Sequence, residues 1–289
     1  MNPHCKEITD QLFEGQTAFQ RTAIVNRVFH AKKTALIHNL KNGKYFGGRK
    51  AAWIVHVIEF QHRGLPHVHI VYRLEDGPDH SDEEACIAFI DEFISAKMPL
   101  IGNPDDEEYR KRVETHMLHK CSNNAANGCL DENCICKKGF SKGIVPETTL
   151  DSKGYPTYAR PGEADWNVVP HNREMLMDDP DGMHINTEFA ASTYTVIYLF
   201  KYLFKGNRKI TLTLNNTDGI HDEDEINHFL RGRMISSMEA CWRILGYDIY
   251  PASTPSVYSI KIKTYGQILA LEEKYKLSDF QVIKIYINI

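Results

Sequence analysis

Residues 59–71 read EFQHRGLPHVHIV, a pattern that predicts a strand, a tight turn and a second strand. Because side chains alternate between the two faces of a strand, His67 and His69 point the same way. If Gln61 lies opposite His67, then Glu59 lies opposite His69, and the four polar side chains share one face. The stretch therefore indicates an antiparallel hairpin that carries a compact polar cluster.

Two imidazoles with a carboxylate or an amide form a mixed nitrogen and oxygen donor set. Such a set suits a divalent cation that keeps open coordination positions for a substrate. Both Glu59 and Gln61 face the same way as the histidines, so the third ligand stays open between them. The competing interpretation is a polar hairpin surface in contact with solvent, which is at least as common for a bare His-x-His pattern.

A second informative segment is the apolar run from Phe189 to Phe204, which predicts a helix. Its start signal is the polar triplet Asn186-Thr187-Glu188, which places a carboxylate in the first turn. Its stop signal is Lys205 followed by a glycine. We therefore expect a single helix that begins near residue 187 and ends at residue 205.

Tyr198 and Tyr202 lie four residues apart in this run and would share one face of the helix. Lys201 and Lys205 each follow a tyrosine by three residues and can lie beside it. A tyrosine hydroxyl is a weak nucleophile at its usual pKa near 10, but a nearby ammonium or a metal-polarised phosphodiester removes much of that handicap. The alternative is a stripe of Tyr, Phe and Leu packed in the core, which is the commoner meaning of such helices.

In combination, the His-x-His strand and the paired tyrosines with their lysines resemble the Helitron helicase-like N-terminal domain, the Rep/HUH endonuclease part of rolling-circle Helitron transposases. The resemblance extends from Asn2 to about Tyr258. It rests on short blocks that are weak singly and specific in this order. The blocks are Asn2-Pro3-His4, Glu7-Ile8, Gly15-Gln16, Arg27-Val28-Phe29, Glu59-Phe60-Gln61, Arg63 to His69, Val169 to Asn172, His184-Ile185-Asn186, Tyr198 to Tyr202 and Glu239 to Ile244.

The resemblance implies a Rep/HUH-like α+β fold, in which helices cover an antiparallel sheet that carries the His-x-His hairpin. It also implies nicking and transfer of single-stranded DNA. One tyrosine would form a 5′-phosphotyrosine, and the second could take another strand end. The ion at His67 and His69 would be Mg²⁺ or Mn²⁺ and would polarise the scissile phosphate. The implied partners are single-stranded DNA and a helicase supplied by a longer version of the chain.

Composition is that of an ordinary globular protein, with 42% hydrophobic and 25% charged residues. The sequence has no run of about 18 apolar residues and no signal-peptide core, so we expect no membrane association. The seven cysteines are an odd number, which favours a reducing compartment. Together with the resemblance, this predicts an intracellular, nuclear protein.

The net charge of −4 hides a strong asymmetry along the chain. Residues 1–74 carry 11 Lys and Arg against 4 Asp and Glu, whereas residues 75–119 carry 4 against 13. The candidate DNA contacts are Arg208 and Lys209, which follow the tyrosine segment, and Arg63 in the hairpin turn. For Arg63 a solvated loop is the competing interpretation. We expect a cationic groove that follows a nucleic-acid backbone.

A Cys/His-rich insertion spans about 115–143 and can supply a tetrahedral Zn²⁺ site. The resemblance implies three cysteines with one histidine just before the first. The histidine stays open between His116 and His119, because the family usually places it three residues before the cysteine and His119 lies two before. If Cys136, which directly precedes Lys-Lys-Gly-Phe, is the ligand, then Cys134 is the extra thiol. The alternative is a reduced loop without metal. The candidate ligands are His119, Cys121, Cys129 and Cys136.

We expect one Rep/HUH-like domain over 1–265 and an unassigned tail over 266–289. Within it, helices are predicted in the first 40 residues, over 82–97 and over 234–245, and strands over 51–60 and 67–74. The helix over 234–245 carries Trp242, which is either a core residue or a side chain that stacks on a base.

The sequence contains no Gly-x-x-x-x-Gly-Lys-Ser/Thr phosphate loop, so we expect at most the nicking half of a Helitron protein, without a helicase motor. The alternative function is that of a catalytically inactive Helitron-derived fragment that binds nucleic acid.

Overall fold

The computed structural model describes residues 2–60, 64–122, 128–179, 183–190, 235–249 and 282–288, the last range by its backbone alone. These residues form helices and antiparallel sheets, which confirms the predicted α+β class. In chain order the elements are α1 (Lys6–Thr9), η1 (Ala18–Gln20), α2 (Thr22–Lys41), β1 (Ala51–Phe60), β2 (Pro66–Leu74), α3 (Glu83–Phe93), α4 (Pro104–His116), β3 (Thr149–Leu150), β4 (Pro156–Thr157), η2 (Glu163–Asp165), α5 (Arg173–Asp178), β5 (His184–Ala190), α8 (Ser237–Ile244) and β6 (Val282–Asn288).

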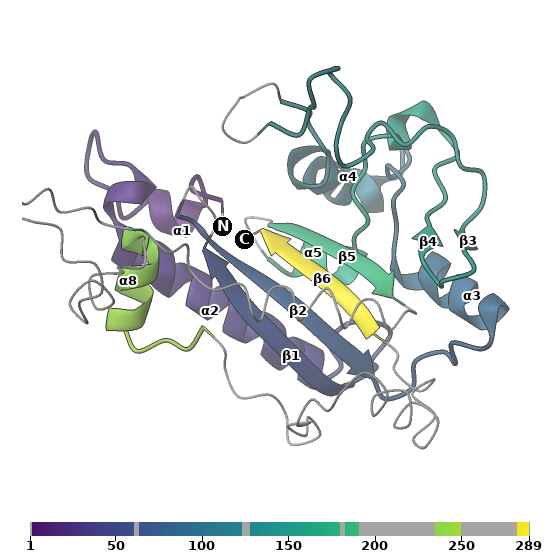
Figure 1. Ribbon diagram of the computed structural model, residues 1–289, viewed down its shortest axis with the longest axis horizontal. Coiled ribbons are helices and arrows are strands. Elements are labelled where there is room, and N and C mark those ends of the chain that lie inside the picture. Colours follow the sequence, from purple (N-terminus) through teal and green to yellow (C-terminus); the bar gives the residue numbers. More distant parts are fainter. Residues whose placement is uncertain are drawn as a thin grey trace, which may run out of the picture.

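A four-stranded antiparallel sheet lies at the centre, with the strand order β1-β2-β6-β5 (Figure 1). Strands β1 and β2 confirm the two strands predicted from the hairpin pattern. Strand β6 pairs with β2 on one side and with β5 on the other. It comes from the tail 266–289, which the sequence assigned to no domain, so this tail contributes an inner strand of the sheet.

The register of β1 against β2 differs from the predicted one. Glu59 lies opposite His67, and Val57 lies opposite His69, so the pairing is shifted by two residues from the expected match of Gln61 with His67. A shift of two residues keeps every side chain on its original face. The alternation of polar and apolar residues therefore cannot distinguish the two registers. Glu59, His67 and His69 still lie on one face of the hairpin, as predicted.

The segment predicted to begin the tyrosine helix is a strand instead. Residues 184–190 form β5, whose side chains alternate between buried Ile185, Thr187 and Phe189 and half-buried neighbours. The predicted helix start at 186–188 is therefore wrong. The residues are β-branched or aromatic at every second position, a period-two pattern that outweighs the helix-start signal. The rest of the apolar run, from residue 191 to Phe204, lies outside the described residues.

Helix α2 covers one face of the sheet and supplies much of the core (Figure 1). Its buried residues recur at helical spacing, and Phe29 and Leu36 join Ile58 and Ile70 of the sheet in one apolar cluster. Helix α8 packs against α2, and its Trp242 is fully buried with its ring centroid 5.8 Å from that of Phe29. The core interpretation of Trp242 is confirmed, and the base-stacking alternative is wrong.

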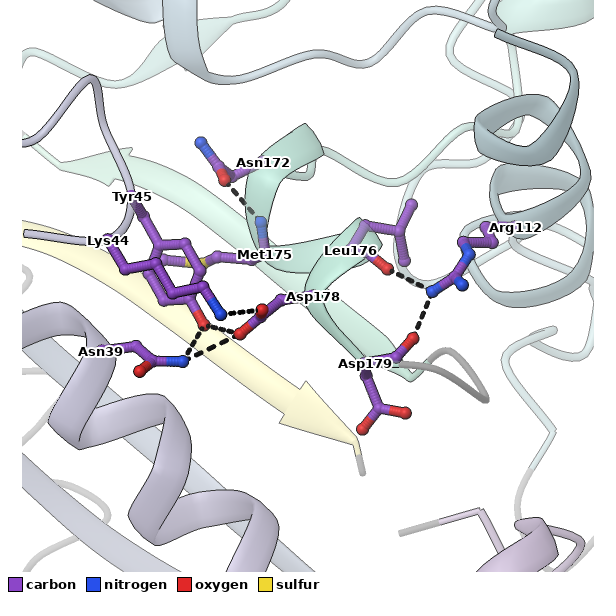
Figure 2. Close-up of polar contacts among 9 residues, drawn as sticks. All are labelled: Asn39, Lys44, Tyr45, Arg112, Asn172, Met175, Leu176, Asp178 and Asp179. Atoms are coloured by element: carbon purple, nitrogen blue, oxygen red, sulfur yellow. Dashed lines mark hydrogen bonds and ion pairs between the residues drawn. The ribbon is translucent and has the colours of Figure 1, made fainter. Parts of the chain in front are cut away.

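A polar network fixes the C-terminal end of α5 (Figure 2). The Asp178 carboxylate accepts hydrogen bonds from the Tyr45 hydroxyl at 2.6 Å and from Asn39 Nδ2 at 2.8 Å, and it forms an ion pair with Lys44. On the other side, Arg112 of α4 donates to the carbonyl oxygens of α5 and its C-cap. The network joins α5 to α2 and α4, and so holds the segment that leads into β5.

His171 lies at the centre of that leading segment and is fully buried. Its Nδ1 donates to the Val169 carbonyl oxygen at 2.9 Å, so its Nε2 accepts from the Tyr109 hydroxyl at 2.7 Å. Its backbone exchanges two hydrogen bonds with Ser95. Burial lowers the pKa of His171 to about 4, because a charged imidazole would lose its hydration there.

We predict that stability falls below pH 6.5 because His171 must remain neutral in the folded chain. The unfolded state takes up the proton near pH 6.5, whereas the folded state resists it down to about pH 4. Unfolding is therefore favoured by roughly 2 kcal/mol more at pH 5 than at pH 7. His56, whose pKa burial also lowers to about 4, adds to the same trend.

Urea unfolding of the wild type and His171→Gln at pH 5, 6 and 7 measures this effect. The variant should be less stable at pH 7, because it loses both imidazole hydrogen bonds, and its stability should fall less between pH 7 and pH 5. An identical fall in both proteins would contradict the assignment to His171.

Candidate metal and nucleic-acid site

A cavity of about 1030 Å³ lies against the face of the sheet that α2 does not cover. Because side chains alternate along β2, the histidines at 67 and 69 face away from the core side chains Val68 and Ile70. Strands β1, β2 and β5 provide one wall. The other walls come from the segments 118–122, 128–142 and 155–170.

The predicted polar cluster forms part of this cavity. His67 and His69 are each 5% exposed, and their ring centroids are 4.5 Å apart. Glu59 Oε2 contacts His69 Nε2 at 2.9 Å, across a diagonal of the β1–β2 pair. The structure therefore brings Glu59 together with both histidines, whereas Gln61 lies outside the described residues.

Strand β5 adds three polar residues, two of which, Asn186 and Glu188, belong to the wrongly predicted helix start. His184, Asn186 and Glu188 alternate with the buried residues of β5 and line the same cavity. In the sheet register, Asn186 and His69 both pair with the same β6 residue, so they stand in one row across the sheet. The period-two pattern of residues 184–190 is the signal that could have identified them. Burial lowers the pKa of His184, whose Nδ1 donates to the His116 carbonyl oxygen at 2.6 Å.

The Cys/His-rich insertion gathers four potential metal ligands, His119, Cys121, Cys129 and Cys136. Their ligand atoms all lie within 4.8 Å of one another, and Cys136 Sγ lies 3.4 Å from His119 Nε2. Tetrahedral zinc with ordinary bond lengths separates sulfur and nitrogen ligands by about 3.6 Å. The donor set and its spacing therefore fit Zn²⁺. Among the residues that the structure describes, this is the group of at least three His, Cys, Asp or Glu side chains whose ligand atoms lie close enough together to hold one metal ion.

Local structure explains how the four residues meet. His119 follows α4 and is held by its backbone N–H, which donates to the Asn167 carbonyl oxygen at 2.8 Å. Its ring stacks on Phe140 at 4.3 Å. A small hairpin joins Cys129 to Cys136: Leu130 and Cys136 form an antiparallel bridge, and Lys137 N donates to the Cys129 carbonyl oxygen at 2.7 Å. The turn of this hairpin is closed by Cys134 N, which donates to the Asp131 carbonyl oxygen at 3.1 Å.

Two further candidates from the insertion stay outside the group. Cys134 is exposed in this turn, with a positive φ of 60°, and His116 contributes its carbonyl oxygen to His184. The cluster therefore includes the histidine at 119. Backbone hydrogen bonds from Phe140 and Lys138 outweigh the effect of burial and lower the pKa of Cys136, which favours the thiolate that a metal needs.

The remaining predicted site residues lie outside the described residues. They are the candidate catalytic residues Tyr198, Lys201, Tyr202 and Lys205, the candidate DNA contacts Arg63, Arg208 and Lys209, and Gln61.

Comparison with known families supports the resemblance over the first quarter of the chain. Residues 1–72 match the sequence model of a family described as "Helitron helicase-like domain at N-terminus". The matched segment runs from α1 into β2 and contains Glu59, His67 and His69. No curated protein and no solved structure matches the chain. Among the described helices, none has the length and apolar character that crossing a bilayer requires.

We predict that the purified chain carries about one Zn²⁺ at the Cys/His cluster. Replacing Cys129 and Cys136 together by serine should abolish the bound metal and lower the melting temperature, because two of the four ligands are lost. Metal analysis and thermal unfolding measure both effects. Cys134→Ser is the matched control and should retain zinc. Equal zinc contents in the double variant and the wild type would contradict the cluster as the metal site.

Proposed function

We propose that the chain nicks single-stranded DNA and transfers the cut strand, as the nuclease part of a rolling-circle Helitron transposase. One observation carries this proposal. Glu59, His67 and His69 stand together on a cavity wall, and they lie inside the segment that matches the Helitron family model. The same cavity is lined by Lys120, Lys137, Lys138 and Lys142, so the polar cluster and these cations could stabilise the negative charge of a phosphodiester during cleavage.

The three residues fit a Mg²⁺ or Mn²⁺ ion in kind, since a carboxylate and two imidazoles on one face form a mixed donor set. Glu59 and His69 contact each other directly at 2.9 Å, so an ion bound here would take the place of that contact. When bound, it would supply a positive charge that polarises the scissile phosphate.

The covalent chemistry is assigned to tyrosine, on the strength of the resemblance. The phenolic oxygen of Tyr198 or Tyr202 forms a bond to phosphorus, while the bond from phosphorus to the 3′ oxygen breaks. The phenolic proton passes to the departing strand, which leaves as a free 3′-hydroxyl, and the 5′ phosphate stays on tyrosine. Lys201 and Lys205 would stabilise the phenolate. The phosphotyrosine is a phosphodiester, so transfer of the strand to a new end needs no ATP.

We predict that His67→Ala or His69→Ala reduces metal-dependent nicking by about 100-fold or more, the scale on which lost electrostatic stabilisation of a transition state is felt. Binding of the oligonucleotide should persist, because it depends on cationic and stacking groups. The assay is incubation of a labelled single-stranded oligonucleotide with Mn²⁺, followed by a denaturing gel. His38→Ala, an exposed histidine on α2, is the control. Nicking at the wild-type rate by a variant that carries both His67→Ala and His69→Ala would refute the assignment of these histidines as metal ligands.

We also predict that Tyr198→Phe and Tyr202→Phe each leave part of the covalent adduct, whereas the double change leaves none. Strand transfer should suffer more than first cleavage in either single variant, because transfer uses both nucleophiles in turn. The measured quantities are the yields of adduct and of transferred strand. An adduct that survives in the double variant would mean a different nucleophile, with Tyr194 the first to examine.

Nucleic-acid binding without cleavage is the second candidate function. One observation favours it. Among the described residues, the side chains that lie close enough together to hold a metal belong to the Cys/His cluster and not to the group of Glu59, His67 and His69. This function predicts that the wild type binds the oligonucleotide and forms no adduct with Mg²⁺ or Mn²⁺. The gel assay therefore separates the two candidates.

A further inference from the structure

Arg160 is a charged side chain in an unusual position. It is only 3% exposed, yet it lines the cavity that also contains the Glu59, His67 and His69 cluster. Its backbone is fixed by an antiparallel bridge to Val145, with hydrogen bonds in both directions. The guanidinium is thus held at a defined place in the wall.

The protein gives this buried cation only neutral partners. Arg160 Nη1 donates to the Tyr158 carbonyl oxygen and Nη2 to the Val168 carbonyl oxygen, each at 3.2 Å, and its Nε–H has no hydrogen-bond partner. It forms no ion pair with a carboxylate of the described residues. Asp165 is a carboxylate whose charge acts on Arg160, but its two oxygens accept hydrogen bonds from the backbone N–H groups of Met98 and Gly162 and form no ion pair with the guanidinium.

A buried guanidinium without a counter-ion is costly, and burial lowers the pKa of Arg160 accordingly. An anion that enters the cavity beside Arg160 would supply the missing negative charge. Arginine suits a phosphate in particular, because its planar fork offers paired donors to tetrahedral oxygens.

The charged residues of the cavity wall are mostly positive. Its cations are Lys120, Lys137, Lys138, Lys142 and Arg160, against the two carboxylates of Glu59 and Glu188. Three of the lysines follow Cys136 in the metal-binding insertion. Lys142 is held there, since its Nζ donates to the Lys138 carbonyl oxygen at 3.0 Å and lies 5.1 Å from the centre of the Phe140 ring.

We propose that Arg160 is a phosphate-binding residue that receives a backbone phosphate of single-stranded nucleic acid, with Lys137 and Lys138 of the Cys/His insertion neutralising neighbouring phosphates. This inference rests on the proposed function for its choice of ligand. It adds that the insertion contributes a wall of the binding site. The same chemistry would hold a free phosphate or a mononucleotide, so the experiment includes both sources.

The test is binding of a fluorescent oligothymidylate to the full chain at several salt concentrations, without added Mg²⁺ or Mn²⁺ so that no cleavage occurs. Arg160→Gln should weaken binding about tenfold and reduce the slope of log K against log salt by about 0.7, the value for one phosphate contact on a single strand. The double change Lys137→Gln and Lys138→Gln should reduce the slope by about 1.4. Lys111→Gln, an exposed charge on α4 away from the cavity, should leave the slope unchanged.

Thermal unfolding separates a binding role from a structural one. The oligonucleotide should raise the melting temperature of the wild type and raise that of Arg160→Gln less. A lower melting temperature in the variant, with an unchanged salt slope, would overturn the proposal by making Arg160 merely structural. If Arg160→Gln does not fold, the double variant Lys137→Gln and Lys138→Gln provides the test, because both side chains are exposed. An unchanged slope of log K against log salt in that variant would also overturn the proposal.

Two further arms identify the ligand. Stabilisation of the wild type by inorganic phosphate or a mononucleotide, without binding of the oligonucleotide, would overturn the nucleic-acid assignment. Oligonucleotide binding that depends on Arg160, in a chain that never forms the tyrosine adduct, would support the phosphate site and refute the nicking function.

Discussion

The alternation of side chains along β1, β2 and β5 is the constraint on which the rest of the molecule depends. One face of the sheet packs its apolar residues against α2, and this burial provides the main core. The opposite face is thereby left with every second residue, which in these strands includes Glu59, His67 and His69. Apolar burial on one side and a polar cavity on the other are two results of the same period-two geometry.

The polar cavity is also shaped by elements far from the sheet. The segment around His171 is anchored by Tyr109 and Ser95, and the Asp178 network fixes α5 directly after it. These contacts hold the segment whose residues Val169 and Pro170 line the cavity. The Cys/His cluster positions the neighbouring wall, because three of the lysines that line the cavity come shortly after Cys136 in the sequence. A metal in the cluster would thus order charges that lie outside its own coordination sphere.

Local patterns in the sequence predicted the local features of the fold. The hairpin strands, the helix around Trp242 and the residues of the Cys/His cluster could all be identified, because each depends on spacing within a short segment. Features that depend on distant partners could not be. The β1–β2 register has an equivalent alternative two residues away, and β5 carries a polar triplet that imitates a helix start. Arg160 has no motif around it, and its significance comes only from burial without a counter-ion.

The position of β6 has a consequence for how the chain acquires its structure. Val68 of β2 pairs with Ile287 of β6, about 220 residues further along the chain, whereas β1 and β2 are neighbours in sequence. Contacts between such distant residues form slowly, because a long loop must close first. The unit of α2, β1 and β2 is able to assemble early, but β2 and β5 then present unpaired edges that invite association with other chains. The two halves of the polar face come into line only when β6 is inserted between them. The surface that carries the histidines is therefore completed only after β6 has been synthesised and inserted between β2 and β5.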